Sequence, residues 1–423
     1  MESNQINSPA VKPARSRASS DALVLDARLR QSLVTVRSLG SRGLQVAALE
    51  THEELSVPTF SSCWCHYKAV CPAYEGTKDY LTSLEQVLDA TGSRVLITSS
   101  DGTIEMIRQH RERLEQRVQI ALAQEPALAI AVSKERTLEL AKRLGVGVPH
   151  AVTVGDVSEV RAALREIGLP AVVKPVESWV KGEQQGDRVI SQLVTTPDEA
   201  QRAVEELTQC GGRALFQQFL PGRRESLSFL YAQGHMYARF AQWAKRTNPP
   251  LGGTIVLRQS IAMPPDIGER AERLVREIEL EGYSEVEFRR NNAGKPYLME
   301  INPRLNASVE VAVRAGIDFP YLLYQWANRD RIDAVEGYRT GVWMRHLGGD
   351  IATTLASVWH HGRPDVATPA KAIGGFCTSF FVPMGYDYLD WKDLRPLCTA
   401  VMGFPHGIWR QAKVGFSQKR KRS

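Results

Sequence analysis

The sequence predicts a multidomain protein that combines the α/β and α+β classes, and three observations support this prediction. Its 423 residues exceed what one compact core usually holds, so two or three packed units are expected. Short apolar runs alternate with helix-like segments over residues 21–120, which is typical of a small parallel α/β unit. The middle third instead mixes helices with strands that a hairpin turn joins, as in an α+β fold.

The composition is that of an ordinary globular protein. Hydrophobic residues make up 43% and charged residues 24%, which excludes a collagen-like or mucin-like polymer. No stretch reaches the roughly 20 apolar residues that a membrane-spanning helix needs. The first 20 residues lack the apolar core of a secretory signal and are expected to form a disordered leader. Six cysteines at irregular positions do not suggest a disulfide framework, so we expect a cytoplasmic protein.

The net charge is +6, and part of the excess lies at the two ends of the chain. Lys12, Arg15 and Arg17 precede the first apolar run, and residues 419–422 are all Lys or Arg. Such tails usually do no more than keep chain ends solvated. The alternative, in which the last residues touch an anionic membrane surface or nucleic acid, lacks interleaved aromatic residues, and no nucleic acid is expected. An acidic or phosphorylated substrate would explain the basic charge equally well.

A cluster of potential metal ligands occurs at Cys63, Cys65, His66 and Cys71. It lacks the paired two-residue spacings of a zinc site, and two of its members are adjacent. Incidental packing is therefore favoured over a metal site.

The N-terminal unit is predicted to contain alternating strands and helices. Its first strand is followed by no G-x-G-x-x-G turn, so a dinucleotide-dependent oxidoreductase lacks its phosphate-binding loop. The predicted strands are Ala22–Asp26, Gln45–Leu49 and Val95–Thr98, and the predicted helices are Ser32–Leu39 and Tyr80–Ala90.

The most informative segment is a predicted hairpin that carries three oxygen-bearing side chains. Glu300 and Asn302 are two residues apart and share one face of a strand, and an antiparallel neighbour can bring Glu287 beside them. Two carboxylates and an amide suit one or two Mg²⁺ ions that also contact phosphates. In the alternative, a structural cluster, Arg304 or Arg289 would neutralise the carboxylates. Placing polar residues on one strand face brings no packing gain, which favours the metal site.

The segment from Glu287 to Glu300-Ile301-Asn302-Pro303-Arg304 resembles the metal-binding signature of the ATP-grasp superfamily, the fold of biotin carboxylase, carbamoyl phosphate synthetase and D-alanine ligase. Lys134, Lys174 and the segment 216–222 occur in the family's order, so the resemblance covers roughly residues 126–326. It implies a two-lobed ATP-grasp fold that binds ATP and Mg²⁺, or Mn²⁺ in its place.

The resemblance also implies roles for individual residues. Those expected to hold the nucleotide are Lys134 and Lys174 at the phosphates, Gln217, Gln218, Phe219 and Leu220 at the adenine, and Glu225 at the ribose. Those expected to hold the metal are Glu287, Glu300 and Asn302. Those expected to act in catalysis are Lys174 and Arg304, the latter at the substrate carboxylate or the acyl-phosphate.

Two features depart from the family's pattern. Gln217 and Gln218 stand where a glutamate is usual, so the adenine would depend more on backbone groups. The segment 178–186, with Lys181, is a candidate phosphate-covering loop but has only two glycines, and a plain surface loop is equally supported. Arg258, on a predicted strand Thr254–Ser260, either faces the phosphates or the acyl intermediate, or is solvated.

Within the superfamily, four segments resemble the predicted carboxylate-amine ligase branch, also described as ATP-dependent carboligases. They are Ala22–Asp26, Arg37–Gly40, Ser99–Asp101 and the region of Lys174. The domains expected on this basis are the leader 1–20, a parallel α/β pre-ATP-grasp domain 21–125, an ATP-grasp domain 126–327 and a C-terminal appendage 328–423 of unassigned role.

The predicted activity is therefore that of a ligase. A carboxylate would be activated with Mg-ATP as an acyl-phosphate and joined to an amine or similar nucleophile. A catalytically silent nucleotide-binding regulator is the alternative, which only the two hinge glutamines support. Small-molecule carboxylates and amines are the expected partners, and a homodimer is left open beside a monomer.

Overall fold

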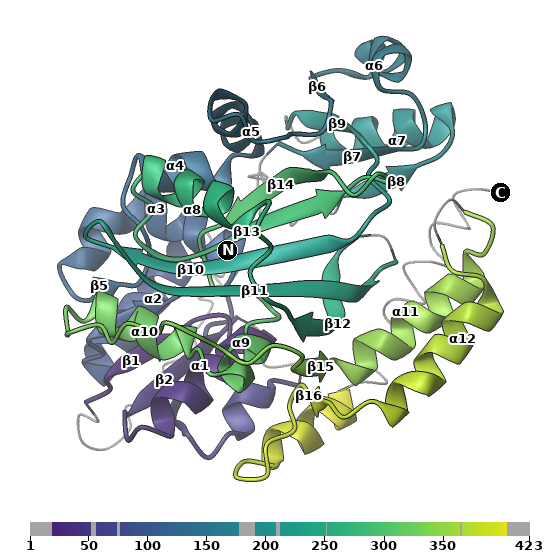
Figure 1. Ribbon diagram of the computed structural model, residues 1–423. Helices are drawn as coiled ribbons and strands as arrows, with labels where there is room; N and C mark the ends of the chain where they lie inside the picture. Colours follow the sequence, from purple (N-terminus) through teal and green to yellow (C-terminus); the bar gives the residue numbers. More distant parts are fainter. Residues whose placement is uncertain are drawn as a thin grey trace, which may run out of the picture.

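The computed structural model describes residues 19–51, 56–73, 77–176, 191–208, 212–250, 252–363 and 366–403. Their strands form a five-stranded, a four-stranded and a seven-stranded sheet, which occupy separate regions of the molecule (Figure 1). One sheet is parallel and the other two are largely antiparallel, so the predicted combination of α/β and α+β classes is confirmed. None of the helices in the described ranges is long and apolar enough to cross a membrane.

The N-terminal sheet is parallel and has the strand order β3-β2-β1-β4-β5. Its strands are β1 (Ala22–Val24), β2 (Val46–Glu50), β3 (Cys65–Val70), β4 (Val95–Ile97) and β5 (Gln119–Ile120). The helices that accompany it are α1 (Arg30–Gly40), α2 (Lys78–Thr91) and α3 (Asp101–Glu115), with a 3₁₀ turn η1 (Pro58–Ser61).

Strand alternation lets this sheet bury both of its faces. Leu23 and its neighbours on one face pack with residues of α2 and α3, among them Leu84. Val24 and its neighbours on the other face pack with α1 and with Phe319, which belongs to helix α10 (Phe319–Ala327). A helix that is far from this unit in sequence therefore completes the N-terminal layer.

The four-stranded sheet forms a separate small lobe (Figure 1). It is antiparallel, in the order β6-β9-β7-β8, with strands β6 (Ala151–Val154), β7 (Ala171–Pro175), β8 (Gln192–Val194) and β9 (Ala214–Gln218). The accompanying helices are α4 (Ala127–Val132), α5 (Lys134–Arg143), α6 (Val160–Ile167) and α7 (Pro197–Thr208), with η2 (Val157–Glu159). Val173 and Phe216 point to the face that α6 and α7 cover, so Lys174 and Gln217 point to the opposite face.

The seven-stranded sheet is the centre of the molecule and has the order β14-β13-β10-β11-β12-β15-β16. Its strands are β10 (Arg224–Ala232), β11 (His235–Asn248), β12 (Thr254–Ser260), β13 (Gly282–Arg290), β14 (Pro296–Asn302), β15 (Trp343–Arg345) and β16 (Gly385–Tyr386). Phe229, Val286 and Phe288 form an apolar face that packs with Leu274 of helix α8 (Gly268–Glu277). The alternate residues of the same strands supply a polar face.

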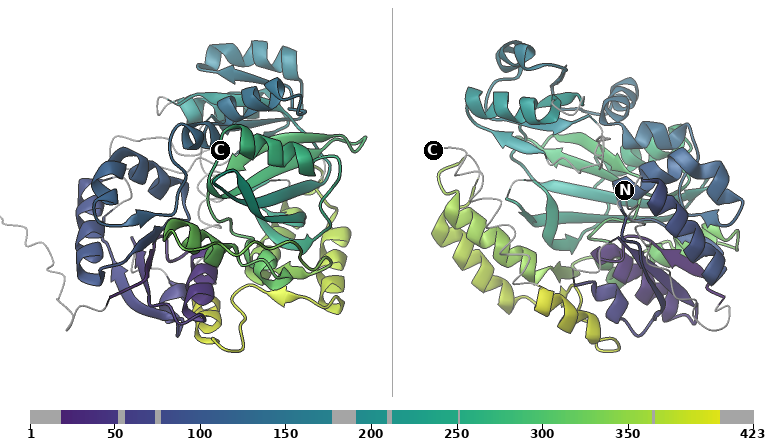
Figure 2. Two further views of the ribbon diagram at one scale, coloured as in Figure 1. Left: turned by 60° about the vertical axis from the view of Figure 1, so that its left-hand side comes forward. Right: turned by 180° about the vertical axis from the view of Figure 1, so that it is seen from behind.

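The C-terminal part contributes to this sheet and then extends from it. Strands β15 and β16 lie beyond residue 327, so residues on either side of that position share one sheet; the division into domains stays a prediction. The helices of this part are α9 (Glu310–Ala315), α11 (Leu347–Trp359) and α12 (Pro369–Thr378), with η3 (Ser379–Phe381). Helices α11 and α12 pack side by side along the periphery, as the views in Figure 2 show.

Buried ion pairs attach the C-terminal part to the N-terminal unit and to the central sheet. The carboxylate of Asp387 accepts two hydrogen bonds from Arg258, at 3.2 and 2.6 Å, and pairs with Arg30 of α1. Arg258 is fully buried, and its Nε also donates to the backbone oxygen of Ser308. The solvated position considered for Arg258 is therefore wrong, since the charge of Asp387 allows this guanidinium to leave water.

Replacing Asp387 by Asn is expected to destabilise the fold by about 3–5 kcal/mol, because two buried arginines lose their counter-charge. Burial opposes ionisation, but Arg258 and Arg30 outweigh it and hold the pKa of this carboxyl below its usual range. The resulting stability is present above the unfolded pKa and is lost as the pH falls. Urea unfolding at neutral pH measures the effect, with Asp390→Asn as the control at a partly exposed position. Equal stabilities of the two variants would contradict this account.

Candidate functional site

The predicted hairpin is confirmed, and its register brings acidic residues together. In the pairing of β13 with β14, Glu287 lies opposite Glu300 and Glu285 lies opposite Asn302. Directly paired residues share a face, so all four side chains project from the polar face of the sheet. The amide nitrogen of Asn302 lies 3.4 Å from carboxylate oxygens of both Glu285 and Glu300. The structure therefore brings together the three residues predicted to hold a metal.

Glu285 is a member of this acidic cluster that the sequence analysis missed. It is buried and accepts a 2.6 Å hydrogen bond from Asn306, whose amide also donates to Tyr283. The available signal was strand alternation, since Glu285 stands two residues before Glu287 and must share its face.

Positive charge reaches the cluster from an adjacent strand as well as from the two arginines considered above. Arg224, on the adjacent strand β10, pairs with Glu287. Arg289 donates to the backbone oxygen of Gly222, and Arg304 donates to Asp101 at 2.6 Å. Both also act on the carboxylates through their charge, Arg289 on Glu287 and Arg304 on Glu300 and Glu285.

Two lysines approach the cluster from the small lobe. The Nζ of Lys134, at the first residue of α5, lies 3.9 Å from the carboxylate of Glu300. Lys174, near the end of β7, is buried, which lowers its pKa to about 8; Lys134 adds to this effect, and Glu300 and Glu287 oppose it. A buried lysine with this pKa keeps much of its charge at neutral pH and is poised to bind an anion.

Burial and mutual repulsion perturb the carboxyl groups. Burial and, to a smaller extent, the charge of Glu287 raise the pKa of Glu285 to about 7. Burial also raises the pKa of Glu287, against the effect of Arg224. For Glu300, the lysines outweigh burial and lower the pKa. The cluster therefore carries more negative charge than its protein surroundings comfortably neutralise, which suits a site for a cation.

The donor set fits a hard cation, although it is not arranged as a closed metal site. Within the described ranges, no three His, Cys, Asp or Glu side chains are grouped so that they could hold a metal by themselves. Carboxylate and amide oxygens are nevertheless the ligands that Mg²⁺ prefers, and Mg²⁺ usually completes its shell with water and phosphate oxygens. The residues present therefore fit a metal that arrives together with a phosphate ligand.

The predicted adenine hinge begins within β9 and continues past its end. Gln217 is fully buried, and neither polar atom of its side-chain amide has a hydrogen-bond partner in the described part of the chain. Leaving such a group unpaired is costly, so a ligand that donates to it and accepts from it would be favoured. Phe219 and Leu220 are buried, whereas Gln218 is exposed. Gln217 is thus the hinge side chain best suited to bind a ligand.

The hinge turns sharply against the carboxylate hairpin. The backbone nitrogen of Gly222 donates to the backbone oxygen of Arg290 at 2.9 Å, and a Cβ at this position would collide with that carbonyl. Only glycine fits so close an approach. The turn thereby places the end of the small lobe next to β13.

Glu225 does not join the acidic cluster. It alternates with Arg224 along β10 and so projects from the opposite face of the strand. Its carboxylate is buried and pairs with Arg290 at 2.8 Å and with Arg223 at 3.1 Å. The predicted ribose contact stays a prediction.

A small cavity of about 40 Å³ lies between the acidic cluster and helix α3. Arg304 borders this region through its pairing with Asp101, at the first residue of α3. The residues that line the cavity are Asp101, Ile104, Glu105, Arg108, Ala131, Val132, Lys134, Glu300, Ile301, Asn302 and Pro303. The N-terminal unit therefore forms one wall of the site.

Two further predictions concern a candidate phosphate-covering loop and the cysteine cluster. The candidate loop 178–186, with Lys181, lies outside the described residues. In the cysteine cluster, Cys63 is exposed, whereas Cys65 and Cys71 are buried. Burial raises the pKa of the Cys65 thiol to about 12, which disfavours the thiolate that a metal would need.

Comparisons with known proteins agree with this geometry. A family model described as an ATP-grasp protein in the biosynthetic pathway with the Ter operon matches residues 213–347. The D-alanine–D-alanine ligase of Gloeobacter violaceus is 27% identical over 226 residues, which are 48% of this chain and 70% of that protein. The chain spans 58–66% of the length of the other D-alanine–D-alanine ligases it matches.

Solved structures share the fold at low sequence identity. N5-carboxyaminoimidazole ribonucleotide synthetase in its ADP complex has a TM-score of 0.61 at 12% identity, over 86% of this chain and 98% of that one. The biotin carboxylase domain of the Hydrogenobacter thermophilus 2-oxoglutarate carboxylase, a dimer with MgADP and bicarbonate, has a TM-score of 0.59 at 16% identity. That match covers 77% of this chain and 73% of the domain.

In the metal-free protein, the raised pKa of Glu285 is expected to make stability depend on pH. The folded chain retains a proton on this group up to about pH 7, whereas the unfolded chain releases it near 4.5. Stability should therefore fall as the pH rises between these values, by at most about 3 kcal/mol.

Urea unfolding at several pH values tests this expectation. Glu285→Gln should reduce the fall, because Glu287 keeps its own raised pKa, and the exposed Glu269→Gln should leave the fall unchanged. A Glu285→Gln curve parallel to that of the unsubstituted protein would show that this carboxyl is not the source.

Proposed function

The chain belongs to the ATP-grasp superfamily, and on this premise we propose that it is an ATP-dependent ligase that activates a carboxylate as an acyl-phosphate and joins it to an amine or similar nucleophile. The observation that carries the proposal is the meeting of two lysines of the small lobe with the acidic cluster of the central sheet. Cations from one lobe and carboxylates from the other face a common space, as binding of a metal-bound polyphosphate requires.

The nucleotide would lie between the small lobe and the central sheet. Lys134 and Lys174 supply positive charge to its phosphates, and the buried amide of Gln217 offers both a donor and an acceptor to the adenine edge. Phe219 and Leu220 provide an apolar wall. Solved structures that share this fold contain ADP and MgADP, which supports this assignment.

Glu287, Glu300 and Asn302 would hold Mg²⁺, with Glu285 as a further acidic neighbour. When bound, the metal neutralises charge on the phosphate oxygens. Arg224 pairs with Glu287 from the adjacent strand β10, so the carboxylate of Glu287 keeps a fixed orientation.

In the proposed reaction, an oxygen of the substrate carboxylate attacks the γ-phosphorus of ATP, and the bond to ADP breaks. The nucleophile then attacks the carbonyl carbon of the acyl-phosphate and releases phosphate. No protein side chain forms a covalent bond. Lys174 and Arg304 stabilise the negative charge, and Asp101 fixes the orientation of Arg304 through a 2.6 Å hydrogen bond.

Partners, assembly and location form the remaining part of the proposal. The substrates are small-molecule carboxylates and amines, in line with the D-alanine–D-alanine ligase relative. Five cysteines in the described ranges are free thiols, which supports a reducing cytoplasm. A homodimer is supported by the dimeric biotin carboxylase domain. A catalytically silent regulator is not favoured, because the acidic cluster and both lysines are in place.

The ligase proposal predicts ADP release from ATP and Mg²⁺ only in the presence of a suitable carboxylate and acceptor. Pools of amino acids and small carboxylates, assayed for ADP, test this prediction. Glu300→Gln should reduce the stimulated rate by about 100-fold or more, because one oxygen ligand of the metal loses its charge.

Glu139→Gln is the matched control, since this glutamate lies exposed on α5 outside the site. Nucleotide binding without stimulated ADP release in any pool would favour the regulator. Equal rates in the two variants would remove Glu300 from the site.

The pKa of Lys174, about 8, predicts how nucleotide affinity changes with pH. Below this value the lysine is charged and attracts the phosphates, and above it the free protein must take up a proton to bind. ATP affinity should therefore fall as the pH rises from 8, by up to about tenfold per unit. Titration calorimetry of ATP at pH 7 to 9 measures this, and Lys174→Arg should flatten the profile because arginine stays charged. Identical profiles would contradict a phosphate contact.

A further inference from the structure

Exposed large hydrophobic side chains concentrate in one region, which we name the C-terminal arm (residues 347–403). Among the described residues, nine of the eleven large hydrophobic side chains that are exposed belong to this arm, against Val70 and Leu169 elsewhere. Phe381, Trp391 and Trp359 are 87%, 81% and 72% exposed. Clusters of this kind on an otherwise polar surface mark a binding face.

Helix α11 shows why the apolar side faces outward. Its buried residues are small or polar, and two of them anchor it to β11: Asp350 pairs with Arg246 at 2.6 Å, and Thr353 donates to the backbone of Thr247 at 2.6 Å. Leu355 and Trp359 occupy the opposite, exposed side. The helix therefore docks through polar contacts and leaves its apolar side to another partner.

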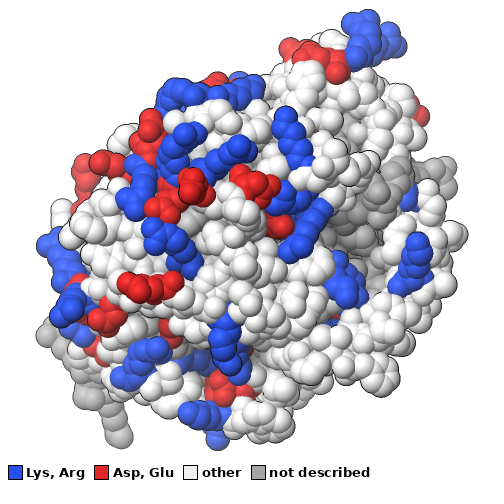
Figure 3. All heavy atoms as spheres, in the orientation of Figure 1, with Lys and Arg blue, Asp and Glu red and all other residues white. Residues whose placement is uncertain are grey.

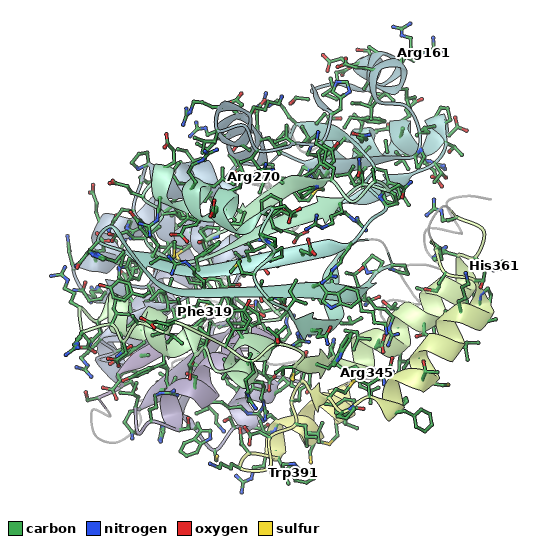
Figure 4. All side chains as sticks on the ribbon, viewed as in Figure 1. Arg161, Arg270, Phe319, Arg345, His361 and Trp391 are labelled. Carbon is green, nitrogen blue, oxygen red and sulfur yellow. The ribbon has the colours of Figure 1, made fainter. Side chains whose placement is uncertain are left out.

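Helix α12 continues this face. None of its residues is buried, although it contains Ile373 and is followed directly by Phe380 and Phe381. In Figure 4, His361 lies near one end of the arm and Trp391 near the other. Figure 3 shows a mostly uncharged surface, with scattered Lys and Arg, where α11 and α12 lie in Figure 1. Exposed apolar side chains therefore occur along the length of the arm.

The exposed charge of this arm is mostly positive. Residues 347–403 contain four Lys and Arg, five Asp and no Glu. Three of those aspartates, Asp350, Asp387 and Asp393, are buried and paired with arginines from other elements. Lys371, Lys392 and Arg395 are exposed, whereas Asp390 is half-buried and lies 3.9 Å from Arg314, so the described part of the arm leaves a predominantly basic charge at its surface.

We propose that the C-terminal arm binds the surface of an anionic lipid bilayer, with α11 and α12 lying in the interface plane. Trp and Phe side chains prefer the boundary between head groups and acyl chains, and Lys and Arg are attracted to anionic head groups. Both kinds of side chain are exposed on this arm. A second copy of the chain would also cover the apolar residues, but two copies would bring like charges together, which opposes pairing.

Flotation of the full-length protein with vesicles tests this proposal. Vesicles of equal parts phosphatidylcholine and phosphatidylglycerol should carry the protein upward, and vesicles of phosphatidylcholine alone should carry much less. The double variant Phe381→Ser, Trp391→Ser should reduce the bound fraction by about tenfold or more, because affinity scales with the apolar area that enters the interface.

Leu169→Ser is the matched control, since Leu169 is exposed on the small lobe and should leave flotation unchanged. Circular dichroism and ATP affinity of the double variant establish that it is folded. Flotation that neither salt nor the double variant weakens would overturn the proposal. So would a protein that does not float and changes from dimer to monomer with the double variant, because the face would then join two copies.

Discussion

Crowding of three glutamates on one face of a hairpin, two of them buried, is the constraint on which the site depends. Carboxylates this close repel one another and are poorly solvated, so positive charge must approach from the surroundings. Arg224 comes from the adjacent strand, and Lys134 and Lys174 come from the small lobe. The same electrostatic requirement therefore draws the two lobes together and leaves room for a bound cation.

A second set of buried charges organises the rest of the molecule. Asp387 joins Arg30 of the N-terminal unit to Arg258 of the central sheet, and Asp350 joins Arg246 and Arg345. Because α11 uses its polar residues for this attachment, its apolar residues face outward. The internal ion pairs and the exposed apolar face are thus two consequences of one arrangement, and they link the stability of the fold to the surface that we propose binds lipid.

Local patterns predicted the hairpin and several elements of the N-terminal unit. Alternation of polar and apolar residues identified β13 and β14, and short apolar runs identified β1, β2 and β4. The predicted helices Ser32–Leu39 and Tyr80–Ala90 lie within α1 and α2. Partners from distant strands were not visible, because Arg224 reaches Glu287 only through the pairing of β10 with β13. Glu225, the next residue, faces the other side for the same reason.

The sequence by itself determined the class of fold, the superfamily resemblance and the three candidate metal ligands, because each depends on the order and spacing of residues along the chain. Tertiary structure alone decided which charges meet. Lys134 and Glu300 are far apart in sequence, as are Arg258 and Asp387, and only packing of separate sheets places them in contact. Which side of α11 is covered was likewise decided by where the buried arginines lie, since a helical pattern by itself does not state which of its faces will find a partner.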